Sequence, residues 1–138
     1  MASPCDYAKV LVAKAKDDYA ALQVLLDNGY QFEDNKPDMM ALTKGPVWGM
    51  FDDSHMDPEL DRDDLHPTQP SIAEMTEKAI ELLSKNNKGF FLMVEGSQID
   101  WAGHANDAAY MTFDFLAFDD AVGKALDFAK EDGHTLVL

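Results

Sequence analysis

The sequence predicts an α/β fold in which a partial, mostly parallel sheet is flanked by helices. Two short apolar runs, at 46–51 and 90–94, are each bounded by turn residues. Runs of this kind are typical of strands that are buried on both faces of a parallel sheet. From residue 71 onward the pattern alternates helix, strand, helix and strand, as in a doubly wound unit. With 138 residues, the chain has the length of one domain.

The N-terminal half is expected to form short elements. A helix over 17–28 ends at Asn28-Gly29, which is a helix stop signal. The acidic, proline-containing stretch 52–70 is interpreted as a solvated loop, and its His55 and His66 as histidines that bind no metal. The other elements expected here are a helix at 6–16, a strand at 30–32, a helical turn at 37–42 and a strand at 46–51.

The C-terminal half gives stronger signals. Ser71 and Glu74 have the spacing of a capping box, and a half-buried helix follows them. A second amphipathic helix is predicted at 107–131, and Gly133 is its expected C-terminal stop. The apolar residues 135–138 predict a further strand.

The charge excludes several classes of partner. Eleven Lys and Arg against 26 Asp and Glu give a formal net charge of −15. This balance argues against nucleic acid or an anionic membrane as a partner. The sequence has no apolar stretch long enough to span a membrane and no recognisable signal peptide. With one cysteine, Cys5, the chain forms no internal disulfide.

Three possible metal ligands directly follow the run 90–94. In open α/β sheets, ligands bind beyond the carboxyl ends of the strands, where Glu95, Asp100 and His104 are expected. Asp100 and His104 are four residues apart, so a helical turn places them on one face. Oxygen and nitrogen donors of this kind suit zinc, and carboxylates suit magnesium. The alternative is structural: Glu95 caps a neighbouring helix and Asp100 is an N-cap residue.

Several motifs in this order and spacing closely resemble alkaline phosphatase. The match is densest after residue 71, and it includes Val94-Glu95-Gly96 and the Ile-Asp-x-x-x-His motif of Ile99 to His104. Further matched stretches are 47–51, 75–86, 89–92, 118–122 and 135–138. The resemblance covers residues 17–138 and marks an internal fragment of the family.

The resemblance implies an alkaline-phosphatase-like α/β fold and a role in hydrolysing phosphate monoesters with zinc and magnesium. Glu95 matches the family's magnesium ligand, and Asp100 and His104 match ligands of one zinc ion. Trp101 stands where other members have a lysine or histidine close to phosphate. Family members are usually exported, to the periplasm or outside the cell, and form homodimers.

Other family motifs have no match in the chain, so no catalytic nucleophile is assigned. The only Asp-Ser pair, Asp53-Ser54, lacks the residues that surround the family's nucleophilic serine. The Thr-Ala-Asp-His motif and a later histidine ligand are also absent. We therefore interpret 17–138 as a partial alkaline phosphatase domain, inactive alone, and 1–16 as an unassigned helix or a segment added for expression. The alternative is a non-catalytic metal- or partner-binding module that folds alone.

Overall fold

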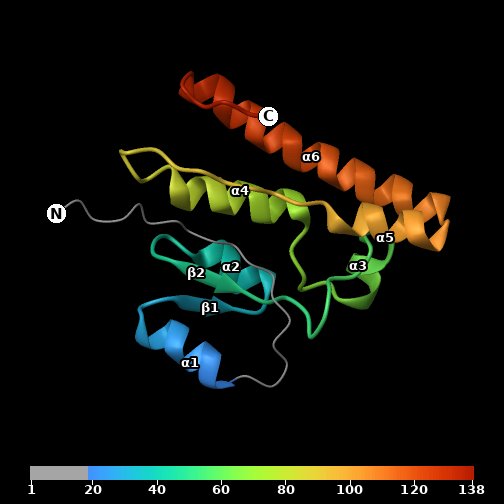
Figure 1. Ribbon diagram of the computed structural model, residues 1–138, viewed down its shortest axis with the longest axis horizontal. Coiled ribbons are helices and arrows are strands. Elements are labelled where there is room, and N and C mark those ends of the chain that lie inside the picture. The colour runs from blue at the N-terminus through green and yellow to red at the C-terminus, as the bar shows by residue number, and fades with distance from the viewer. Residues whose placement is uncertain (1–18) are drawn as a thin grey trace.

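The computed structural model describes residues 19–138, and side chains from Leu22 onward. The helix expected at 6–16 therefore lies outside the described residues. The elements along the described chain are α1 (Tyr19–Asp27), β1 (Gln31–Glu33), α2 (Lys36–Ala41), β2 (Val47–Gly49), α3 (Glu59–Leu65), α4 (Ile72–Leu83), α5 (Ser97–Ala105) and α6 (Ala108–Asp132) (Figure 1). A helix-rich chain with a small parallel sheet confirms the predicted partial α/β class.

The sheet consists of β1 and β2, which pair in parallel with Phe32 opposite Trp48. Helix α2 forms the connection between these strands, and Asn35 caps it by accepting a hydrogen bond from the Asp38 amide at 2.9 Å. Parallel strands require a crossover of this kind because a tight turn cannot join them. The buried core beside the sheet is formed by Met39, Leu42 and Phe51.

Helix α4 begins with the predicted capping box. The Glu74 amide donates to Ser71 Oγ at 3.2 Å, and the Ser71 amide donates to Glu74 Oε2 at 2.8 Å. The first four backbone amides of a helix have no intrahelical acceptor. The capping box gives two amides at the start of α4 a side-chain acceptor. The inner face of α4 buries Ala79, Ile80 and Leu83.

Helix α6 is the longest element, with 25 residues, and confirms the helix predicted at 107–131. Asp107 caps its start and Gly133, at φ 70°, ends it in the left-handed region that glycine adopts without strain. Helix α6 runs alongside α4 on one side of the small sheet, and α1 lies on the other side (Figure 1).

The run 90–94 is not a strand in the structure, and it is not buried on both faces. Phe91 and Met93 are 73% and 72% exposed, whereas the Phe90 ring contacts Phe128 of α6 with 5.9 Å between centroids. Strand formation requires a hydrogen-bonded neighbour, and no strand of the described residues pairs with this run. Residues 135–138 are likewise not in a strand.

The acidic stretch 52–70 is more ordered than a solvated loop. It contains α3, which the sequence pattern did not predict, and it buries Gln69, Pro70 and the guanidinium of Arg62. Arg62 donates to both carboxylate oxygens of Glu59, at 3.0 and 2.9 Å, and to the Gln69 carbonyl at 2.9 Å. The interpretation of the whole stretch as a surface excursion is therefore wrong.

Candidate metal centre

Helix α5 carries two of the predicted ligands on one exposed face. His104 Nε2 lies 3.4 Å from Asp100 Oδ2, and the two side chains are 83% and 75% exposed. The four-residue spacing produces this proximity because side chains at i and i+4 lie one turn apart. An imidazole nitrogen and a carboxylate oxygen that face the same side form a donor pair that suits zinc.

Glu95 lies just before α5 and lines a cavity of about 590 Å³. The cavity lies between the chain around Met56, helix α4, the run 92–96 and helix α6, and Asp100 and His104 do not line it. Glu95 therefore borders a cavity that the donor pair on α5 does not line. A magnesium ligand and two zinc ligands need not meet at one ion, so this separation suits two metals.

Gly96 allows the sharp entry into α5. A Cβ atom at this position would lie 2.9 Å from the Phe118 ring and 3.2 Å from Ile99 Cδ1. Contacts this short require the ring or the backbone to move. The glycine therefore lets the chain pass close to α6 between Glu95 and Asp100.

We expect Gly96→Ala to destabilise the chain by about 1–3 kcal/mol, the usual range for overpacking. The measurement is urea unfolding followed by circular dichroism. Gly123→Ala is the matched control, because a Cβ at Gly123 of α6 meets nothing within 4 Å. Alanine there should stabilise the helix by about 0.5–1 kcal/mol. Equal free energies of unfolding for the two variants would contradict the steric argument.

A buried carboxylate, that of Asp114, lies on the α6 side of the cavity. Asp114 is 9% exposed, and burial raises its pKa to about 6. Its carboxylate accepts a hydrogen bond from the Glu59 amide at the start of α3, 3.2 Å from the nearer oxygen. The pKa of Tyr110, one helical turn before it, is raised by burial and then by the charge of Asp114.

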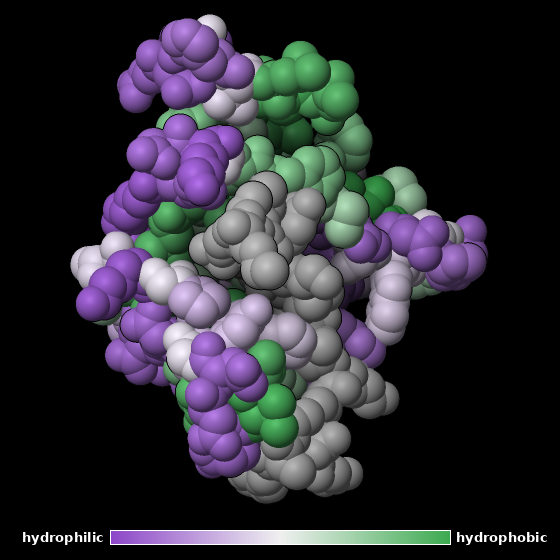
Figure 2. Space-filling view, turned by 60° about the vertical axis from the view of Figure 1, so that its left-hand side comes forward, coloured by the Kyte–Doolittle hydropathy of each residue, from purple (hydrophilic) through white to green (hydrophobic). Residues whose placement is uncertain are grey.

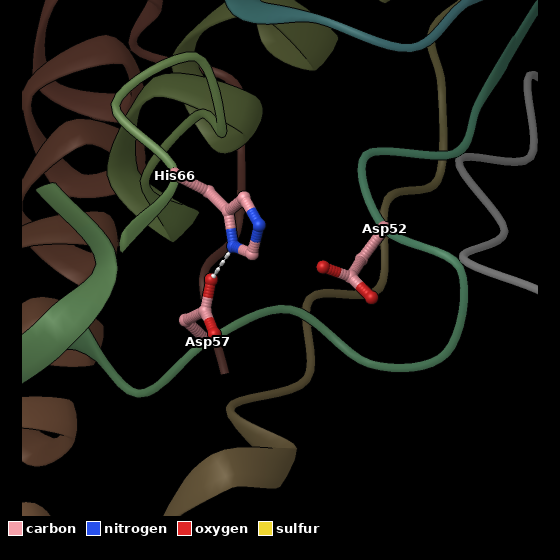
Figure 3. A group of neighbouring side chains, drawn as sticks. All are labelled: Asp52, Asp57 and His66. Carbon is pink, nitrogen blue, oxygen red and sulfur yellow. Dashed lines mark hydrogen bonds and ion pairs between the residues drawn. The ribbon is translucent and has the colours of Figure 1, made fainter. Parts of the chain in front are cut away.

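A second group of donors lies in the stretch 52–70, where no metal ligand was expected. Among the described residues, Asp52, Asp57 and His66 bring ligand atoms within 4.8 Å of one another. Asp57 and His66 form a hydrogen-bonded ion pair, and the Asp52 carboxylate lies across from them on the loop that follows β2 (Figure 3). The hydrogen bond to Asp57 raises the pKa of His66.

Gln69 connects this group to the protein interior. Its side chain is 2% exposed, donates to Asp52 Oδ2 at 2.8 Å and accepts from the Asp57 amide at 3.2 Å. Sequence spacing offers no signal for the group, since separations of five and nine residues match neither helix nor strand periodicity.

The comparisons with known proteins identify the family. The family model described as Alkaline phosphatase matches residues 8–138. The chain belongs to the alkaline phosphatase family. Alkaline phosphatase 3 of Bacillus subtilis is 45% identical over 111 residues, which cover 80% of this chain and 23% of the relative. Alkaline phosphatase of Escherichia coli is 37% identical over 136 residues, covering 80% of this chain and 28% of the relative.

Solved alkaline phosphatases share the fold. The enzyme of the Antarctic bacterium TAB5 gives a TM-score of 0.74 at 35% identity, covering 90% of this chain and 36% of that chain. The cold-active enzyme of Shewanella sp. gives 0.76 at 27% identity, covering 91% and 30%. A mutant of the TAB5 enzyme has been solved with magnesium bound. The chain therefore spans about a quarter to a third of the length of these alkaline phosphatases.

Two further features concern the surface of this alkaline phosphatase segment. No helix in the described part of the chain is both long and apolar enough to cross a membrane. Trp101 of α5 is 46% exposed, and its indole packs against the His55 ring with 4.0 Å between centroids. Local sequence patterns contain no indication of this contact, because 46 positions separate the two residues.

Proposed function

We propose that the chain is a segment of a metal-dependent phosphate monoester hydrolase and contributes part of its zinc and magnesium site. In this proposal Asp100 and His104 hold zinc, Glu95 holds magnesium, and Trp101 lies near the phosphate. The observation that carries the proposal is the pairing of Asp100 with His104 on one exposed face of α5, within the region that matches the family.

The residues present fit these metals. Zinc accepts mixed nitrogen and oxygen ligands, and magnesium prefers carboxylates with water. When bound, such metals activate an oxygen nucleophile and stabilise negative charge on phosphate. Asp100 and His104 supply the donor atoms for zinc, and Gly96 keeps their helix close to α6. Glu95 supplies a carboxylate at the cavity wall.

Further parts of the proposal come from the family. The parent protein is an exported, periplasmic or secreted homodimer that acts on phosphate monoesters, with neither nucleic acid nor membrane as a partner. The isolated chain lacks the serine nucleophile and is inactive. Turnover of p-nitrophenyl phosphate by the pure chain, abolished by Glu95→Ala, would contradict this inactivity.

The test of the metal assignment is zinc binding to the chain by calorimetry. We expect Asp100→Ala combined with His104→Ala to weaken zinc binding at least about 100-fold, the upper end of the loss caused by removing partners of metal ligands. The matched control is Asp127→Ala with His134→Ala, an exposed acidic and imidazole side chain near the end of α6. This control should leave zinc affinity unchanged. Zinc binding that survives the Asp100 and His104 double variant, or no zinc binding by the chain, would contradict the proposal.

The second candidate function is a non-catalytic metal- or partner-binding module. Exposed apolar side chains favour it, since Phe91 and Met93 lie outward on the run before α5. Hydrophobic surface also gathers near the top of the face in Figure 2, the end at which Figure 1 places α6 and the C-terminus. Exposed apolar patches often mark interaction sites. Metal binding without any effect of added phosphate would favour this module over the hydrolase segment.

A further inference from the structure

The segment 54–59 is attached to helices α5 and α6 by contacts along its length. In the middle, Gln98 of α5 donates its side-chain amide to the Met56 carbonyl and accepts a hydrogen bond from the Tyr110 hydroxyl of α6. At the end, the Glu59 amide donates to the Asp114 carboxylate at 3.2 Å. These two hydrogen bonds join residues that are separated by 42 and 55 positions in the sequence. The segment is therefore held by tertiary contacts.

This attachment holds His55 against Trp101. The ring centroids are 4.0 Å apart and the planes meet at 61°, an edge-to-face arrangement. Such aromatic pairs attract each other beyond the effect of the area they bury. Ser54 Oγ lies 3.0 Å from His55 Nδ1, and this hydrogen bond further restrains the imidazole. His55 and Trp101 both line the cavity, as Glu95 does.

We propose that His55 is a positioning residue for Trp101, and that its imidazole holds the indole at the wall of the cavity that the proposed magnesium ligand, Glu95, also lines. This inference rests on the proposed function, which places Trp101 near the phosphate. Trp101 is 46% exposed even with the His55 ring in contact, and without that ring it would sample several side-chain rotamers. The Met56–Gln98 and Glu59–Asp114 hydrogen bonds fix the segment that contains His55 relative to α5 and α6.

The experiment measures the surroundings of Trp101 directly by fluorescence. The chain has two tryptophans, so Trp48→Phe leaves Trp101 as the single indole. In this background we expect His55→Ala to shift the emission to longer wavelength. Because the indole goes from about half exposed toward fully exposed, its acrylamide quenching constant should rise about twofold once the ring pair is lost.

Two further variants separate positioning from general loss of structure. His55→Phe keeps a ring in contact with Trp101 and should retain the emission and quenching of the parent. His134→Ala removes an exposed histidine beyond α6 and should change neither. Unchanged quenching in His55→Ala, or equal quenching in His55→Ala and His55→Phe, would overturn the proposal.

The outcome is independent of the test of the proposed function. Fluorescence of Trp101 is measured without metal, whereas the zinc calorimetry reports on Asp100 and His104. If zinc binding fails and the His55 effect remains, the metal assignment is wrong and the positioning of Trp101 stands. If zinc binds as expected and His55→Ala changes nothing, the positioning proposal is wrong and the metal assignment stands.

Discussion

Replacing Arg62 with methionine is expected to lower the free energy of unfolding by about 2–4 kcal/mol. Breaking a buried ion pair by removing one partner typically costs about 3–5 kcal/mol, because the remaining charge stays buried. Arg62 is 6% exposed, and both Glu59 oxygens and the Gln69 carbonyl depend on its guanidinium. The Glu59 side chain is 26% exposed, so water partly replaces the lost partner and moderates the effect.

The measurement for Arg62 is a double-mutant cycle in urea. Glu59→Gln removes the less exposed of the two partner charges, since Asp63, whose side chain is 80% exposed, also lies 2.9 Å from the guanidinium. Arg62→Met in that background should lose less stability than in the parent. Arg62→Lys serves as the conservative variant, and it should also destabilise because an ammonium cannot donate to both carboxylate oxygens in the planar geometry. A loss below about 0.5 kcal/mol for Arg62→Met, the range of ordinary surface substitutions, would contradict the role of this network.

The elements that the sequence predicted well are those with local signals. The Ser71 and Glu74 capping box and the apolar stripe that follows predicted α4, and Gly133 marked the end of α6. The close spacing of Asp100 and His104 predicted that both would share one helical face, and in the structure their donor atoms lie 3.4 Å apart. Local periodicity and capping act within a few residues, so a single sequence contains this information.

The features that the sequence did not predict depend on distant partners. Helix α3 has an acidic sequence without an apolar stripe, and its start is held by Asp114, 55 positions away. The run 90–94 has the composition of a buried strand, yet composition cannot supply the neighbouring strand that a hydrogen-bonded ladder needs. The contact of His55 with Trp101 was not predictable for the same reason. The group of Asp52, Asp57 and His66 also depends on how the loop folds, which local sequence patterns do not contain.

Replacing Asp114 with asparagine is expected to stabilise the chain at pH 8 and to change its stability little near pH 3.5, where the carboxyl is largely protonated in both the folded and the unfolded chain. Burial raises the pKa of Asp114 from its ordinary value of 3.8 to about 6 in the folded chain. The folded state therefore binds a proton more readily than the unfolded state, and wild-type stability decreases as pH rises from about 4 to about 7. Converted to free energy, the pKa difference corresponds to an upper bound of about 3 kcal/mol at pH 8.

Asparagine removes the buried charge but keeps an oxygen that can accept from the Glu59 amide. The variant should therefore recover part of that free energy, about 1–2 kcal/mol, because the bond to a neutral acceptor is weaker than the bond to a carboxylate. The measurement is urea unfolding of both proteins at about pH 3.5, pH 5 and pH 8.

Asp119→Asn is the matched control for Asp114, since it removes one charge from the exposed side of α6 and relieves the net charge of −15 equally. Stabilisation in Asp114→Asn that exceeds the control at pH 8, is about half as large at pH 5 and disappears near pH 3.5 assigns the effect to the buried carboxylate. Equal stabilisation in both variants would mean that general charge repulsion, rather than burial of Asp114, sets the pH dependence. Destabilisation at pH 8 would mean that the charged bond to the start of α3 outweighs the cost of burial, and the expected sign would be wrong.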